Sequence, residues 1–313
     1  MGDWKPRIAV VGAGAMGCLF GGLAAEGGLD VTLVDVWQEH VDRISRDGLR
    51  IVGHGGDRHI PIGATTDPSG LAEVDVLFVQ CKAPYTKEAV KRVLHLLRDD
   101  SVAISFQNGL GNEENIGEVV GMERVLGGVT AQGAAVEGPG AVRNFGDLPT
   151  HIGEMGGGLS ERAERIAAAL DRAGLQTSAS PDIRQAIWKK LLANIAISPT
   201  SAIANMTIKQ VFAVPELIET AYEALDEAVE VARAEGIELN LAETREVIDQ
   251  IAGPAGTGDN KSSLCVDILN RRPCEIDVIS GAVVRLGQLH GIPTPVNKTL
   301  VAAVKALESH YLD

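Results

Sequence analysis

Short apolar runs that alternate with polar segments dominate the first half of the chain. The runs at 7–12, 31–35, 75–82 and 101–108 are strand-length and mostly rich in valine and isoleucine. A helical-looking segment at 19–26 separates the first two. Because alternating strands and helices build a parallel sheet with helices on its faces, this pattern predicts an α/β fold with a Rossmann-type doubly wound sheet.

Further short apolar runs predict strands that complete this sheet. They lie at 123–130, 134–136, 141–145 and 150–153, and the E-G-P-G turn at 137–140 joins the middle two as a hairpin.

Helical spacing of the apolar positions takes over from Ser160 onward. The expected helices span 160–174, 182–197, 215–236, 241–253, 262–271, 275–291 and 296–310. The change of pattern predicts two domains, a dinucleotide-binding Rossmann domain at 1–175 and an all-helical substrate and catalytic domain at 176–313.

The glycine motif G-A-G-A-M-G lies between the first strand and its helix. In that context Gly12 permits a tight turn, Gly14 lets backbone approach a pyrophosphate, and Gly17 lets the helix pack closely. The alternative is a glycine-rich turn without a ligand. We expect a dinucleotide to bind this motif, whose members are Gly12, Ala13, Gly14, Ala15, Met16 and Gly17.

Polar residues close three of the predicted strands. Asp35 ends the second, where an acid accepts hydrogen bonds from the ribose of NAD and repels the 2′-phosphate of NADP, so Asp35 favours NADH. It could also be a simple turn aspartate. We expect Lys82 to face a phosphate or ribose and Asn108 to face the nicotinamide end, unless each merely caps its strand.

The stretch W-K-K-L-L-A-N-I-A-I-S at 188–198 predicts a helix that is apolar on nearly all sides but carries polar groups. At the helical period, Lys190, Asn194 and Ser198 form one ridge flanked by apolar residues, whereas Lys189 points to a more exposable side. The pattern therefore selects Lys190 as the desolvated lysine. The alternative is a surface lysine that extends its ammonium group into water.

Two other polar segments open predicted helices. The serines of D-N-K-S-S-L at 259–264 are either N-caps or, with the free helix N–H groups, a site for a carboxylate. Glu275 and Asp277 begin the helix predicted at 275–291, where the helix dipole favours acids.

One reaction accounts for these groups together. Reduction of a 2-oxo acid by NAD(P)H leaves an alkoxide that needs a proton, and a desolvated lysine with a lowered pKa is a suitable general acid. We expect Lys190 to donate this proton and Glu275 to orient it. Asn194 would hold the substrate's oxygen and Ser263 its carboxylate.

Composition excludes other classes of function. The net charge of −14 argues against nucleic acid and anionic membranes, which require a surplus of lysine and arginine. The four scattered cysteines predict free thiols in a cytoplasmic protein and no metal site. The uncharged run at 8–25 resembles a signal peptide, but its five glycines and missing A-x-A site favour the dinucleotide motif.

Taken together, the motifs resemble those of ketopantoate reductases (2-dehydropantoate 2-reductases) over nearly the full chain. The matching segments are G-A-G-A-M-G, the strand ending in C-K, Q-N-G-L-G, G-A-A-V-E-G-P-G, W-K-K-L-L-A-N, S-S-L-x-x-D-x-x-x-x-R-P-x-E-I-D-x-I-x-G and H-G-I-P-T-P-V-N. The resemblance implies a Rossmann domain followed by a helical domain. It also implies reduction of ketopantoate to (R)-pantoate, the precursor of pantothenate.

The resemblance also implies residue roles. Lys190 would be the proton donor, with Lys189 as its neighbour, and Asn108 would lie near both nicotinamide and substrate. Residues that would serve the cofactor or orient Lys190 are Lys82, Ala134 and Glu275. Residues expected around the substrate are Asn194, Ser198, Asn260 and Ser263.

Three positions depart from the family's pattern. Ser198 stands where members commonly have asparagine, and Gln107 where they commonly have histidine. Members that use NADPH often carry an arginine near the end of the second strand, where this chain has Asp35-Val36-Trp37. The family thus favours NADPH whereas Asp35 favours NADH.

The leading interpretation is an NAD(P)H-dependent 2-oxo acid reductase that acts on ketopantoate and forms a homodimer through its apolar C-terminal helices. One alternative is a reductase of another branched or hydroxylated 2-oxo acid. A second, from a different class, is a dinucleotide-sensing module without turnover, which has no need of a buried lysine.

Overall fold

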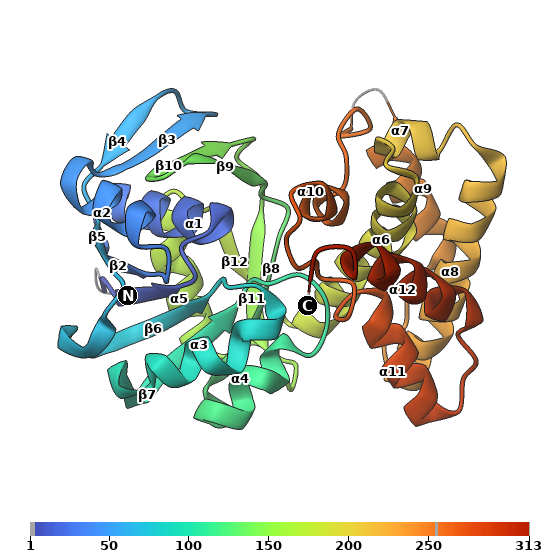
Figure 1. Ribbon diagram of the computed structural model, residues 1–313. Coiled ribbons are helices and arrows are strands. Elements are labelled where there is room, and N and C mark those ends of the chain that lie inside the picture. Colours follow the sequence, from blue (N-terminus) through green and yellow to red (C-terminus); the bar gives the residue numbers. More distant parts are fainter. Residues whose placement is uncertain (1–3, 254–255, 313) are drawn as a thin grey trace. The chain divides into compact units, whose positions relative to one another are not determined.

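The chain forms two compact units in the computed structural model, which describes residues 4–253 and 256–312 (Figure 1). The outermost ends of the two predicted domains therefore lie outside the described residues. The first unit holds the chain up to Gln107 and Asn112–Arg184, and the second holds Asn108–Gly111 and the chain from Gln185. The division falls later than the predicted change near residue 175, because β12 (Thr177–Ala179) is still a strand of the first unit's sheet.

An eight-stranded sheet with the order β12-β11-β8-β7-β6-β1-β2-β5 forms the centre of the first unit. Every neighbouring pair is parallel except β8 and β11, so the predicted α/β, Rossmann-type fold is confirmed. The other strands of this sheet are β1 (Arg7–Val11), β2 (Asp30–Val34), β5 (Gly63–Thr65), β6 (Val74–Val79), β7 (Leu97–Ser105), β8 (Val125–Thr130) and β11 (Thr150–Glu154).

A second sheet of four strands, in the order β4-β3-β10-β9, was not predicted. The hairpin expected to complete the main sheet belongs to it instead, so that prediction is wrong. The reason is that β10 pairs in parallel with β3 and places Val142 in the same core as Ile51 and Ile60. The strands are β3 (Leu49–Gly53), β4 (Arg58–Ile60), β9 (Ala134–Gly138) and β10 (Ala141–Asn144).

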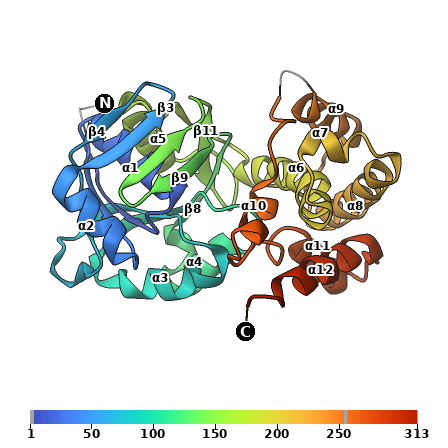
Figure 2. The same cartoon turned by 45° about the horizontal axis from the view of Figure 1, so that its top comes forward.

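Helix α1 (Ala15–Glu26) lies between the two sheets (Figures 1 and 2). Its consecutive glycines face opposite sides: a Cβ added to Gly21 would lie 2.6 Å from Leu33, and one added to Gly22 would lie 2.8 Å from Ile51. The pair therefore lets one helix pack closely against both sheets. The G-x-G-x-x-G turn is attached to a helix that is buried on two sides.

The opposite face of the main sheet is covered by α3 (Thr86–Arg92) and α4 (Asn112–Val120), whose Val90 and Ile116 are fully buried (Figure 1). The remaining helices of this unit are α2 (Gln38–Asp47) and α5 (Glu161–Arg172). Short 3₁₀ turns occur at Pro68–Gly70, Ala83–Tyr85, Leu94–Leu96 and Met122–Arg124.

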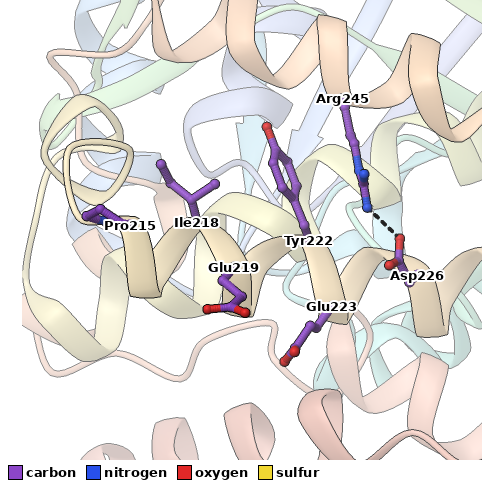
Figure 3. Close-up of a pocket in the computed structure, with 7 residues that line it drawn as sticks. All are labelled: Pro215, Ile218, Glu219, Tyr222, Glu223, Asp226 and Arg245. Atoms are coloured by element: carbon purple, nitrogen blue, oxygen red, sulfur yellow. Dashed lines mark hydrogen bonds and ion pairs between the residues drawn. The ribbon is translucent and has the colours of Figure 1, made fainter.

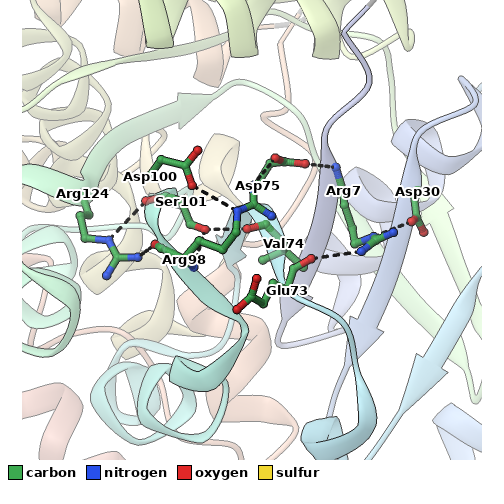
Figure 4. A network of polar contacts seen from close by, with 9 residues as sticks. All are labelled: Arg7, Asp30, Glu73, Val74, Asp75, Arg98, Asp100, Ser101 and Arg124. Atoms are coloured by element: carbon green, nitrogen blue, oxygen red, sulfur yellow. Dashed lines mark hydrogen bonds and ion pairs between the residues drawn. The ribbon is translucent and has the colours of Figure 1, made fainter.

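Ion pairs join the amino ends of the central strands (Figure 4). Asp75 accepts a hydrogen bond from the backbone N–H of Arg7 on β1 and pairs with Arg98 on β7, while Arg7 also pairs with Asp30 on β2. These partly exposed contacts fix this end of the sheet structurally. The carboxyl ends, where parallel sheets bind ligands, lie at the opposite end.

The second unit is entirely helical in its described residues, as predicted. Its central helix α6 (Ile183–Ala204) is apolar on nearly all sides, and Leu192 and Ile195 are completely buried. The other helices are α7 (Ile208–Val211), α8 (Pro215–Ala234), α9 (Leu241–Ala252), α10 (Ser263–Leu269), α11 (Ser280–His290) and α12 (Pro295–Glu308).

Two boundaries of these helices differ from the prediction by more than two residues. Helix α6 continues through Pro199 instead of ending at 197, and the hydroxyl of Thr200 donates to the carbonyls of Ala196 and Ile197 inside this turn. The helix expected at 275–291 begins only at Ser280, so Glu275 lies in the turns before α11. Among the described helices, none is both long and apolar enough to cross a membrane.

Candidate active site

The glycine loop after β1 has the backbone shape that a dinucleotide requires. Gly12 has φ +93°, and a Cβ there would lie 2.4 Å from the backbone nitrogen of Cys81, so only glycine fits. A Cβ on Gly17 would lie 2.0 Å from the carbonyl oxygen of Gly12. A Cβ on Gly14 would meet nothing within 4 Å, which leaves space beside the first N–H groups of α1 for a phosphate.

Asp35, directly after β2, fixes this loop. Its Oδ2 accepts the backbone N–H of Ala13 at 2.6 Å, and its Oδ1 accepts those of Val36 and Trp37 at 2.7 and 2.9 Å. The backbone N–H of Ala13 therefore already has Asp35 as its hydrogen-bond acceptor, and this bond stabilises the conformation of the loop. These bonds also orient the carboxylate at the position where Rossmann folds bind ribose.

The strand order places these groups at a switch point of the sheet. β1 lies between β2 and β6. The chain runs from β1 to β2 on one side and later continues with β6 on the other side, and this reversal of strand order creates the crevice where α/β sheets bind ligands. Lys82 lies beyond the end of β6, partly buried at the start of a 3₁₀ turn. Ala134, the first residue of β9, belongs to the second sheet and packs against the core that contains α1.

A polar cluster beneath the β6 and β7 loops was not predicted. The side-chain amide of Gln107 donates to the carbonyl of Cys81 at 2.7 Å and to the hydroxyl of Thr86 at 2.9 Å, so it ties the two loops together. Ser105 donates to Gln107 Oε1 and also contacts the buried Glu113, whose pKa is raised to about 8 by burial. Glu113 opens a polar helix, and its sequence gives no sign of burial.

Lys190 and Lys189 differ in solvent exposure, as the helical period predicts. Lys189 is exposed, whereas Lys190 is partly buried. Burial lowers the pKa of Lys190 to about 8, and the nearby carboxylate of Glu275 partly opposes this shift. A lysine with this pKa is mostly protonated at neutral pH and can readily release its proton, as a general acid requires.

Asn108 and Glu275 meet although they are distant in sequence. The side-chain amide of Asn108 donates to Glu275 Oε2 at 3.2 Å, and the N–H of Leu110 donates to the carbonyl of Val278 at 2.8 Å. Gly109, at φ +89°, packs directly on Val278. The 108–111 loop is thus fixed to the turns before α11, and Lys190, Asn108 and Glu275 form one cluster in the second unit.

The other predicted substrate residues lie further along the ridge and around the start of α10. Asn194 is partly buried and Ser198 is buried, and the carbonyl of Ser198 accepts a hydrogen bond from Ser262. Ser262 is the N-cap of α10, so of the two adjacent serines the first has the capping role that the sequence suggested. Ser263 and Asn260 are both exposed beside it.

A cavity of about 490 Å³ between α8 and α9 contains none of these residues (Figure 3). Arg245 pairs with Asp226 and lies over the ring of Tyr222, so its charge is already neutralised. The lining residues are Pro215, Ile218, Glu219, Tyr222, Glu223, Asp226 and Arg245. We assign it no role in the chemistry.

The glycine loop at a sheet switch point in the first unit is typical of an oxidoreductase that uses a nicotinamide dinucleotide. The lysine of lowered pKa in the second unit is suited to proton donation in such an enzyme. Residues 8–157 match the family described as ketopantoate reductase PanE/ApbA, and residues 182–308 match its C-terminal domain. The chain belongs to the ketopantoate reductase PanE/ApbA family.

Curated relatives and solved structures agree. The chain is 34% identical to the 2-dehydropantoate 2-reductases of Halobacterium salinarum and Archaeoglobus fulgidus, over 96% and 97% of its length and 98% of each relative. It is similar to D-mandelate dehydrogenase with NADH and anilino(oxo)acetate (TM-score 0.93, 29% identity, 97% and 99% of the two chains). It also resembles a PanE/ApbA family ketopantoate reductase from Ralstonia eutropha (TM-score 0.90, 29% identity, 98% and 100%).

Proposed function

We propose that this protein reduces ketopantoate to (R)-pantoate with a nicotinamide dinucleotide, as a step of pantothenate synthesis. The observation that carries the proposal is the partly buried Lys190, whose pKa is lowered to about 8 beside Glu275 and Asn108. The names of the curated relatives support ketopantoate as the substrate.

The chain's own residues supply the proton and hold the proton donor in position. The bound dinucleotide would supply the hydride. Lys190 Nζ donates a proton to the oxygen that becomes the 2-hydroxyl group, and so prevents build-up of negative charge. Glu275 holds the ammonium group in its charged form until transfer, and Asn108 orients Glu275 through their hydrogen bond.

We assign substrate binding to the ridge and the start of α10. Asn194 would hold the oxygen of the substrate, while Asn260 and Ser263 would bind its carboxylate. Ser198 would face the substrate tail. Because serine is shorter than asparagine, its reach towards that tail is shorter, which is the reason to test other branched or hydroxylated 2-oxo acids as well.

The proposal is tested by comparing kcat/KM for ketopantoate with the values for a panel of other branched, hydroxylated and aromatic 2-oxo acids whose 2-oxo group is a ketone. We expect ketopantoate to give the highest value. A higher value for another 2-oxo acid would replace the substrate and keep the reaction, whereas binding of the dinucleotide without any turnover would support the sensing module.

Removing the charge of Glu275 should change the pH dependence. In the wild type, kcat should fall as the pH rises through about 8, because Lys190 loses the proton that it donates. In Glu275→Gln the ammonium group loses its stabilising carboxylate, so this fall should move to lower pH by about one unit or more.

The control for this prediction is Asp277→Asn. Asp277 lies two residues after Glu275, is exposed, and pairs with Lys305. It should leave the fall in kcat at the wild-type pH. Equal pH profiles for Glu275→Gln and the wild type would contradict the assigned role of Glu275.

We further propose that NADH is preferred over NADPH. Asp35 places a negative charge at the ribose position, and the similar D-mandelate dehydrogenase has been solved with NADH. Asp35→Asn should raise the KM for NADH and lower that for NADPH, which would shift the preference by about tenfold or more. Asp42→Asn, which changes an exposed acid on α2, should leave it unchanged. A wild type that prefers NADPH would refute the proposal.

We also propose that the protein is a cytoplasmic homodimer. None of its four cysteines, all of which lie in the described part of the chain, forms a disulfide, as expected for a reducing compartment. Large apolar side chains are exposed on the C-terminal helices, including Leu269 and Leu289. Sedimentation equilibrium should give twice the mass of the chain, and a monomer at micromolar concentration would refute the dimer.

A further inference from the structure

An exposed tryptophan lies directly beside the carboxylate assigned to the ribose. Trp37 is 40% exposed and is the residue before α2, two positions after Asp35. Its indole stacks on the ring of His40, with the centroids 4.9 Å apart and the planes 13° from parallel. Since His40 covers one face of the indole and is itself fully buried, the exposed surface of Trp37 lies on its remaining sides.

The ring beneath Trp37 is held rigidly. His40 Nδ1 accepts the backbone N–H of Gly140 at 2.9 Å, so the ring proton resides on Nε2. That nitrogen lies 3.2 Å from the sulfur of Cys18, which donates to the carbonyl of Ala13 at 3.1 Å. His40 therefore connects the β9–β10 turn, helix α1 and the glycine loop.

The position of Trp37 is fixed by its backbone as well. Its N–H donates to Asp35 Oδ1 at 2.9 Å, and its carbonyl accepts the N–H of Val41 in the first turn of α2. The backbone at Trp37 is thus bonded to the same carboxylate that would hold the ribose. A base attached to that ribose would come within reach of the indole.

We propose that Trp37 is the stacking surface for the adenine of the dinucleotide, with His40 as its rigid support. This inference rests on the dinucleotide-binding part of the proposed function and adds a residue that recognises the base. Adenine is flat and aromatic, and stacking on an aromatic side chain needs no particular hydrogen-bond pattern. Trp37 also places an apolar side chain, and not a cation, beside Asp35. It therefore offers no positive partner to the 2′-phosphate of NADPH.

The test measures binding of ADP-ribose by calorimetry, because this ligand carries the adenine half without the reacting ring. Trp37→Ala should weaken ADP-ribose and NADH by about tenfold to a hundredfold, the range expected for loss of one base-stacking contact. Trp37→Phe should retain most of the affinity. Reduced nicotinamide mononucleotide, which lacks adenine, should bind the wild type and Trp37→Ala equally.

Trp4→Phe is the matched control, since Trp4 lies in the same unit and contacts Arg165 instead. It should bind ADP-ribose like the wild type and keep the quenching of tryptophan fluorescence by ADP-ribose, which Trp37→Phe should lose. Unchanged ADP-ribose affinity in Trp37→Ala would overturn the role of Trp37 alone. A wild type that does not bind ADP-ribose would overturn it together with dinucleotide binding.

Discussion

Lys190→Ala should lower kcat by a factor of ~10²–10⁴, the range that general acid catalysis contributes. The lysine is the proton donor, and alanine has no proton to give to the developing alkoxide. The mutation also leaves Glu275 without its cationic partner. Steady-state oxidation of NADH or NADPH at saturating 2-oxo acid measures this loss directly.

Lys189→Ala is the control, because Lys189 precedes Lys190 on the same helix but is exposed. Its kcat should stay within a few-fold of the wild type. The Lys190 variant should also be at least as stable as the wild type, since a lysine whose pKa is lowered by burial disfavours folding while it is charged. Equal losses of activity in the two variants would show that the ridge does not select the proton donor.

Glu113→Gln should stabilise the protein at alkaline pH. Burial raises the pKa of Glu113 from 4.5 to about 8, so the folded state keeps a proton that the unfolded chain releases. The wild type therefore loses stability as the pH rises from 4.5 to about 8. Glutamine cannot ionise, so the variant should be more stable above that range by an amount on the order of a few kcal/mol.

Unfolding midpoints in urea, compared at acidic and alkaline pH, measure this effect. Glu114→Gln serves as the control because Glu114 is the exposed neighbour on α4, and its curve should follow the wild type. A Glu113→Gln variant that loses stability towards alkaline pH as steeply as the wild type would refute the assignment of a buried, protonated carboxyl group.

The sequence predicted the main sheet because local signals there agree with the final structure. Apolar strands, a glycine turn and a helix follow one another at the right lengths between Arg7 and Val34. The second sheet was missed because β4 has only three residues, and because the pairing of β10 with β3 joins segments about ninety residues apart. No local pattern encodes such a pairing.

The same distinction applies to the site. The helical period alone separates Lys190 from Lys189, because burial on a helix depends on position within a few turns. The contact of Asn108 with Glu275 depends on how the 108–111 loop meets the turns before α11, so only the structure provides it. Glu113 was missed because two adjacent glutamates at a helix start usually lie in solvent.

The central claim is that this chain transfers hydride from a nicotinamide dinucleotide to a 2-oxo acid. Its most direct test uses a reduced dinucleotide in which both hydrogens of C4 are replaced by deuterium and analyses the product by mass spectrometry. We expect the wild type to form pantoate that carries one deuterium at C2, and Lys190→Ala to form almost none. Unlabelled product, or no product although the dinucleotide is bound, would contradict it.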